Sequence, residues 1–220
     1  MSIPLLLAED LQIRSVLDKG RNIGRVSGNL TMFGDRARGA NLAGLIWGEE
    51  LSEATGDRRY ADLIVDVAGR YQPGANDEAP PPCDPDFRTE DMFMTGAMLG
   101  RAFGITGQGH YLDLLVKFLI DSRIQQENGL FWHCRSAPFI WSRGNGFAAL
   151  GLTETLTHLP ETHPGRDTLL NMYCRLMDGL AKVQELSGMY SQILDFPGSY
   201  HELTATCMAG YQWVNPDAPN

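Results

Sequence analysis

The strongest constraint on the fold is a repeat with a period of 51 residues. A Thr-Gly pair, a tyrosine and an Asp-Leu pair recur in the same order and spacing: Thr55-Gly56, Tyr60 and Asp62-Leu63, and then Thr106-Gly107, Tyr111 and Asp113-Leu114. A second echo joins Gly129-Leu130-Phe131 to Gly188-Met189-Tyr190, with His133 and Gln192 each four residues after the glycine. Helical sequence on both sides of each Thr-Gly pair indicates an array of helical hairpins. Because one hairpin cannot bury its apolar face alone, successive hairpins must stack or close into a ring.

The apolar spacing predicts how these hairpins are arranged. Helices are expected over residues 40–54, 57–71, 90–105, 110–126, 146–158 and 165–185, with a last helix from about residue 199. Proline-rich residues 72–87, aromatic-rich residues 128–145 and residues 187–199 are expected to be long loops. No stretch alternates like a strand. We therefore predict an all-α toroid in which inner and outer helices alternate, as one domain over residues 1–220 whose first 30 residues are weakly patterned.

Composition excludes several classes of function. The net charge is −9, with 18 basic residues that do not cluster, which argues against nucleic acid and anionic membranes as partners. No apolar stretch is long enough for a membrane span or has the form of a signal peptide, so a cytoplasmic location is expected. The four cysteines form no C-x-x-C pair, and neither a zinc site nor a disulfide framework is expected. We expect no metal and no cofactor.

Residues capable of chemistry fall at equivalent ends of the predicted hairpins. They supply carboxylates, an imidazole, a guanidinium and indoles, which suit a sugar acid: Asp35, Glu90, Asp91, His133, Trp141 and Arg143. Each also has an ordinary interpretation, such as a first-turn charge pair for Glu90 and Asp91 or a surface cation for Arg143. Neighbouring helical residues point about 100° apart, so at most one of the two carboxylates can face the site.

Several motifs together resemble a known family. They are Glu90-Asp91-Met92-Phe93-Met94, Trp141-Ser142-Arg143-Gly144-Asn145-Gly146-Phe147, and Ser199-Tyr200 with Glu202. Over about residues 34–211 the chain resembles glycoside hydrolase family 105, the unsaturated rhamnogalacturonyl hydrolases, with the unsaturated glucuronyl hydrolases of family 88 as relatives. The resemblance implies an (α/α)6 barrel. It also implies release of an unsaturated uronic acid from lyase-generated pectin fragments, by hydration of the C4=C5 enol ether.

The resemblance also implies roles for individual residues. The catalytic aspartate of the family falls on Glu90, the neighbouring acidic position on Asp91, and a second carboxylate on Asp35. His133, Trp141 and Arg143 match positions that line the uronate site, and substrate contacts are also expected from Phe147, Gln192 and Tyr200. Phe147 stands where many members have tryptophan. Glutamate at position 90 departs from the family pattern by one methylene.

Length is a further departure. The chain holds about four of the six hairpins of such a ring, which predicts exposed helix flanks carrying Met208, Tyr211 and Trp213. Self-association through the open ends, or poor stability with low activity, is the expected consequence. Two other functions stay open: an inactive sugar-binding remnant of the family, and an unrelated α/α toroid enzyme such as a sugar epimerase.

Overall fold

The computed structural model describes residues 46–75, 77–81, 83–196 and 198–214. Within these residues the structure has seven helices and no named strand, as an all-α fold requires. The helices are α3 (Gly48–Thr55), α4 (Arg59–Ala68), α5 (Thr89–Thr106), α6 (His110–Asp121), α7 (Ser142–His158), α8 (Arg166–Val183) and α9 (Leu203–Val214).

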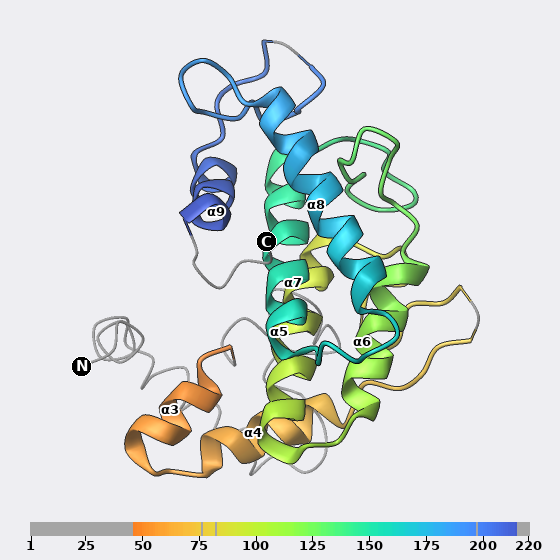
Figure 1. The fold of residues 1–220 in the computed structure, drawn as a ribbon, viewed down its shortest axis with the longest axis vertical. Helices are drawn as coiled ribbons and strands as arrows, with labels where there is room; N and C mark the ends of the chain where they lie inside the picture. Colours follow the sequence, from red (N-terminus) through yellow and green to blue (C-terminus); the bar gives the residue numbers. More distant parts are fainter. Residues whose placement is uncertain (1–45, 76, 82, 197, 215–220) are drawn as a thin grey trace.

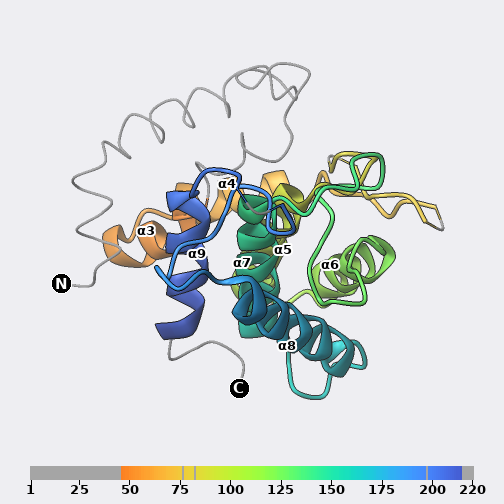
Figure 2. The same ribbon diagram turned by 90° about the horizontal axis from the view of Figure 1, so that it is seen from above.

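The helices form two layers in alternation along the chain (Figures 1 and 2). Helices α5, α7 and α9 lie side by side and run in the same direction, and α6 and α8 pack on their outer side in the opposite direction. Helix α4 packs against both α3 and α5. This is the predicted order of inner and outer helices, and it forms an arc of a toroid.

The Thr-Gly repeat marks two turns with the same geometry. Gly56 and Gly107 both have φ of 69°, the left-handed conformation that glycine adopts at the end of a helix. The hydroxyl of Thr55 donates to Leu51 O at 2.6 Å, and that of Thr106 donates to Ala102 O at 2.6 Å. The repeat seen in the sequence therefore encodes the inner-to-outer turn.

The Gly-aromatic echo marks a second equivalent pair of turns. Gly129 and Gly188 have φ of 87° and 79°, and the glycine carbonyls accept side-chain amides from Gln125 and Gln184, both at 2.9 Å. The aromatic residue after each turn, Phe131 or Tyr190, is buried. The long loops that leave the outer helices therefore also repeat in structure.

Several helix ends differ from the sequence-based prediction: α4 ends at Ala68 rather than near residue 71, α9 begins at Leu203 rather than near residue 199, and two further ends have an identifiable cause. Helix α6 stops at Asp121 rather than near residue 126, because Arg123 has a left-handed φ of 50° and Ile124 O accepts the N–H of Trp132. Helix α7 begins at Ser142, four residues before the predicted start. The Ser142 N–H donates to Gln192 O in the next loop, a distant contact that sequence periodicity cannot register.

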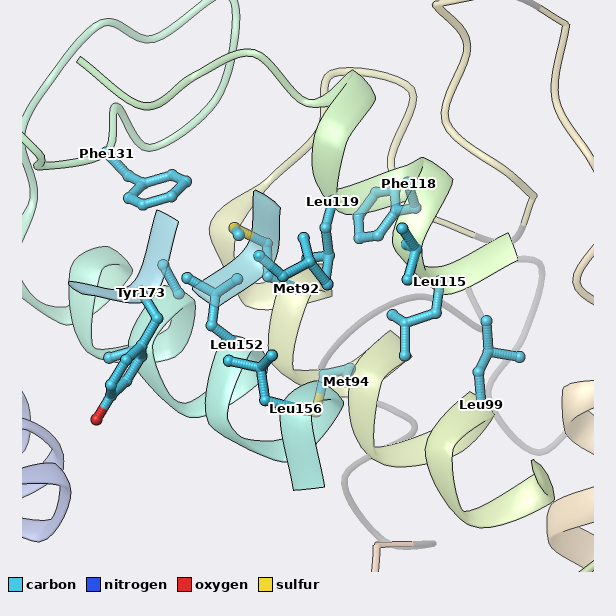
Figure 3. Packing of buried hydrophobic residues seen from close by; sticks show 14 of the residues in the cluster. Met92, Met94, Leu99, Leu115, Phe118, Leu119, Phe131, Leu152, Leu156 and Tyr173 are labelled. Carbon is cyan, nitrogen blue, oxygen red and sulfur yellow. The ribbon is translucent and has the colours of Figure 1, made fainter. Parts of the chain in front are cut away.

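The core lies between the inner and outer layers. Figure 3 shows Met92 and Leu99 from α5, Leu115 and Phe118 from α6, and Leu152 from α7 packed together. Their burial fixes α5 and α7 against the outer helices. The first turns of these two helices are thereby held in fixed relative positions.

Two salt bridges join α3 to the C-terminal parts of α5 and α7. The Arg101 guanidinium on α5 bonds Glu50 on α3 at 3.0 Å and also bonds Glu154 on α7. Arg101 is 12% exposed, so the contact is partly shielded from water. Because Glu50, Arg101 and Glu154 lie in successive repeats, these salt bridges fix the position of each repeat relative to the next.

Helix α9 lies at one end of the arc. It contacts α7, in part through a hydrogen bond between the buried side chains of Thr153 and Gln212. Elsewhere on α9, Leu203, Tyr211 and Trp213 are exposed by 66%, 54% and 49%. Self-association through such residues stays a prediction. None of the described helices is long and apolar enough to cross a membrane.

Candidate functional site

The predicted site residues gather around the first turns of α5 and α7. Glu90 is the second residue of α5, and Arg143 is the second residue of α7. Because the two helices are successive inner helices that run in parallel, these side chains start from equivalent places. The repeat therefore puts a carboxylate and a guanidinium at the same end of the arc.

Glu90 contacts His133 directly. The imidazole Nε2 lies 3.1 Å from Glu90 Oε2 and 3.3 Å from Oε1, and both side chains are 25% exposed. The Thr89 hydroxyl lies 3.4 Å from the same carboxylate. The pair can share one proton, while partial exposure leaves it accessible to a ligand.

Trp141 connects this pair to Arg143. The His133 ring meets the Trp141 ring edge-on, with centroids 5.1 Å apart and planes at 78°. The Arg143 guanidinium carbon lies 4.8 Å from the Trp141 centroid, within cation–π range. His133 and Arg143 thus both contact one indole, and Glu90 is linked to it through His133.

Main-chain hydrogen bonds hold the two site loops in equivalent positions. The first N–H of α5, from Thr89, donates to His133 O at 3.0 Å, and the first N–H of α7, from Ser142, donates to Gln192 O at 3.0 Å. His133 and Gln192 in turn donate their own N–H groups to Phe139 and Tyr200. Gln192 therefore has the same position relative to the start of α7 that His133 has relative to the start of α5.

The Trp-x-Arg-Gly-Asn motif is explained by contacts at the start of α7. Asn145 is fully buried; its amide accepts from Phe131 N at 2.7 Å and donates to the carbonyls of Phe131 and Trp141. At Gly144 a side-chain Cβ would lie 2.8 Å from the Thr89 hydroxyl, which is too close. The motif thus fixes the preceding loop and lets α7 approach α5.

Glu202, which belongs to the sequence motifs but for which no specific role was predicted, also contributes. Its carboxylate is 7% exposed, lies 3.8 Å from Arg143 Nε and accepts the Ala205 N–H at the start of α9. The available signal was its position just before the last helix, in phase with the repeat. Glu202 partly balances the positive charge of Arg143.

Four polar atoms at the start of α7 and in the loop beside it are buried without a hydrogen-bond partner: Trp141 Nε1, Ser142 Oγ, Arg143 Nε and Gln192 Oε1. Buried polar groups are nearly always paired, so these atoms mark a part of the site whose hydrogen bonding is incomplete. They have almost no exposed surface, and the accessible polar groups of the site are instead on the side chains of Glu90, His133 and Arg143, which are 25%, 25% and 39% exposed.

The remaining predicted residues are dispersed. Phe147, one turn along α7, stacks on Phe93 with centroids 6.3 Å apart, and Tyr200 is 66% exposed. Asp91 is buried, with only 4% exposed. Asp35 lies outside the described residues. Among the residues that the structure describes, no group of three or more His, Cys, Asp or Glu could hold a metal ion.

Comparisons with known proteins identify what this chain is similar to. The sequence profile described as Glycosyl Hydrolase Family 88 matches residues 89–214, more than half of the chain. This segment includes every candidate residue except Asp35.

Individual relatives agree with the profile. The chain is 35% identical over 66 residues to the unsaturated rhamnogalacturonyl hydrolase YesR of Bacillus subtilis, a match covering 30% of this chain and 19% of that protein. It is 32% identical over 60 residues to an unsaturated 3S-rhamnoglycuronyl hydrolase of Alteromonas, covering 27% and 14%.

A solved structure shows the fold. A possible member of the GH105 family from Salmonella enterica superposes with a TM-score of 0.72 at 21% identity, covering 94% of this chain. This chain spans 59% of that protein, so the arc is a little over half of the related fold.

Proposed function

The chain belongs to Glycosyl Hydrolase Family 88, and on that premise we propose that it releases an unsaturated uronic acid from lyase-generated rhamnogalacturonan fragments. The reaction is a hydration. A proton is delivered to C4 of the C4=C5 enol ether, water adds at C5, and the resulting hemiketal opens with release of the next sugar. The relatives whose names include such hydrolases support this substrate class.

Glu90 is proposed as the proton donor. Its carboxyl is partly exposed and shares a contact with His133, which can hold or return a proton as the Glu90 carboxyl changes state. The carboxylate left by proton donation can then accept a proton from the attacking water. General acid–base catalysis of this kind typically contributes about 10²–10⁴-fold in rate.

Arg143 and Trp141 are proposed to hold the sugar acid. Guanidinium groups bind carboxylates through directed hydrogen bonds, and an indole offers both a flat apolar face and an N–H donor. The observation that carries the proposal is the partly exposed Glu90–His133 pair next to the Trp141 ring and the Arg143 guanidinium. A uronate has a carboxylate for the guanidinium and an apolar ring face for the indole.

The test follows loss of the enol-ether absorbance when the full chain is mixed with lyase-generated unsaturated disaccharides. We expect turnover that is lost, by at least about 100-fold, in Glu90→Gln. The matched control is Glu53→Gln, an exposed glutamate on α3, which should keep wild-type activity. A folded wild-type chain that leaves the absorbance of every unsaturated disaccharide unchanged would refute the proposed reaction.

A second candidate function is sugar binding without turnover. It is favoured by glutamate where the family resemblance places aspartate. Glu90→Asp separates the two candidates. If the extra methylene misplaces the carboxyl, the shorter side chain should raise turnover, since about 1 Å of misplacement can cost roughly 100-fold. Binding without turnover in both forms would favour the remnant.

A further inference from the structure

Asp91 has surroundings quite unlike those of Glu90. Its side chain is buried, with only 4% exposed, and its Oδ2 accepts the Asp84 N–H at 2.7 Å. It lies near Cys83 and Tyr71, which are also buried. The two adjacent carboxylates thus serve different parts of the molecule, as their angular separation on a helix requires.

The segment that Asp91 holds is a strained turn. Phe87 N–H donates to Asp84 O at 3.0 Å, and the Arg88 guanidinium lies 3.2 Å from the Asp84 carboxylate. Phe87 itself has φ of 57°, an unfavourable value for a large side chain, yet it is fully buried and stacks on Phe118 at 5.6 Å. Such a conformation persists only when several contacts enforce it.

The same turn supports the loop that carries His133. Asp86 accepts the Arg135 N–H on its carbonyl and the Ser136 N–H on its carboxylate, both at 3.0 Å. The Arg135 guanidinium also covers the Phe87 ring at 4.0 Å. Together with the hydrogen bond from Thr89 N to His133 O, these contacts hold residues 133–136 in place against residues 84–89.

We propose that Asp91 is a positioning residue for the Glu90–His133 pair. Its carboxylate fixes the 84–88 turn against the start of α5, the turn fixes the 133–136 loop, and the loop places the imidazole beside Glu90. This role rests on the proposed function, because the pair matters most if it moves a proton. It gives the second carboxylate of the motif a task that requires no contact with substrate.

The protonation state of Asp91 makes this contact depend on pH, and the ionised form that accepts the hydrogen bond more strongly is also the form that burial disfavours. Burial raises the pKa of the Asp91 carboxyl to about 6; the negative charges of Asp84 and Glu90 add to the rise, while Arg88 and the Asp84 N–H oppose it. Cys83 and Tyr71, the other titratable neighbours, have pKa values raised by burial and stay neutral near pH 7. Above about pH 6 the ionised carboxylate is the stronger acceptor for the Asp84 N–H.

Amide hydrogen exchange on the full chain tests the proposal without reference to catalysis. We expect Asp91→Ala to lose at least tenfold protection at the Asp84 N–H and also at the Thr89 N–H, which bonds the His133 loop. Asp91→Asn keeps an acceptor of the same shape and should retain most of the protection at both. The control is Asp66→Ala, which removes an exposed carboxylate paired with Arg70 on α4 and should change neither amide.

Kinetics on the same variants supply the second readout. We expect Asp91→Ala to lower kcat by about 10–100-fold with little change in KM, and Asp91→Asn to restore kcat to within a few-fold of wild type. Unchanged protection at Thr89 in Asp91→Ala would overturn the proposal. So would an Asp91→Asn variant as inactive as Asp91→Ala, because it would show that the carboxyl acts in the chemistry itself. If the wild-type chain has no turnover, the proposed reaction fails while the exchange result still decides the positioning role.

Discussion

Replacing Gly151 by alanine should push the two central inner helices apart. Gly151 lies on α7 where it crosses α5, and an added Cβ would be 2.5 Å from the Met92 carbonyl carbon and oxygen and 2.7 Å from Phe93 N. Ordinary contact begins at 3.4 Å. Since backbone atoms cannot rotate away, the helices would have to separate locally by about 1 Å, which forfeits much of the dispersion energy of the crossing.

The magnitude follows from two opposing effects. Alanine gains about 1 kcal/mol over glycine in a helix interior, while overpacking against a rigid neighbour costs about 1–3 kcal/mol and occasionally more. For a clash with backbone we expect the larger cost, and a net loss of about 2 kcal/mol in the free energy of unfolding. Met92 follows Asp91 directly, so the same shift would move Glu90 relative to Arg143 and lower turnover.

Gly210→Ala is the matched control, because this glycine also lies within a helix, α9, and an added Cβ there would meet nothing within 4 Å. It should stabilise the chain by about 0.5–1 kcal/mol. Urea unfolding followed by circular dichroism measures both variants. Equal or greater stability of Gly151→Ala relative to Gly210→Ala would refute the close-crossing argument.

Three further outcomes are expected from the contacts described above. Asn145→Ala removes three side-chain hydrogen bonds of a buried residue and should lower the free energy of unfolding in urea by about 3 kcal/mol. The control is Asn128→Ala, which removes from an exposed asparagine one turn hydrogen bond with the Leu130 N–H and should cost less than about 1 kcal/mol. Arg101→Ala should cost about 2 kcal/mol in the same assay, because it leaves two partly buried carboxylates without their cation. The pKa of Asp91 rises from 3.8 to about 6 on folding, so the folded state favours the protonated form and stability should fall as pH rises from about 4 to 6. Over that window wild type should lose about 2 kcal/mol relative to Asp91→Asn, and parallel stability–pH curves would contradict this.

The repeating turns were the part of the fold most readable from sequence. Thr-Gly and Gly-aromatic pairs are local signals, and the backbone at Gly56, Gly107, Gly129 and Gly188 adopts the left-handed conformation that only glycine takes without strain. The alternation of inner and outer helices followed from the spacing of these turns. Helix geometry also showed that Glu90 and Asp91 must face different ways.

Non-local contacts explain what the sequence did not reveal. The start of α7 was missed because Gly144 is ordinarily a loop signal, whereas here it permits close approach to Thr89. The role of Glu202 was not predicted because its partner, Arg143, lies 59 residues earlier in the chain. His133 contacts Glu90 rather than Asp91 because residues 84–89 hold the His133 loop in place. No rule of sequence spacing predicts the strained turn in that segment.

The parallel inner helices have an electrostatic consequence for any anionic ligand. The N-termini of α5 and α7 bring the positive ends of two helix dipoles to Arg143, whereas the chain as a whole carries a net charge of −9. The net negative charge of the chain therefore repels a uronate that is far from the site, and Arg143 with the helix N-termini attracts it only when it is close. Because the screening length falls from about 30 Å at 0.01 M salt to about 8 Å at 0.15 M, added salt suppresses the repulsion more than the short-range attraction. Such a ligand should associate faster, rather than slower, as the ionic strength rises.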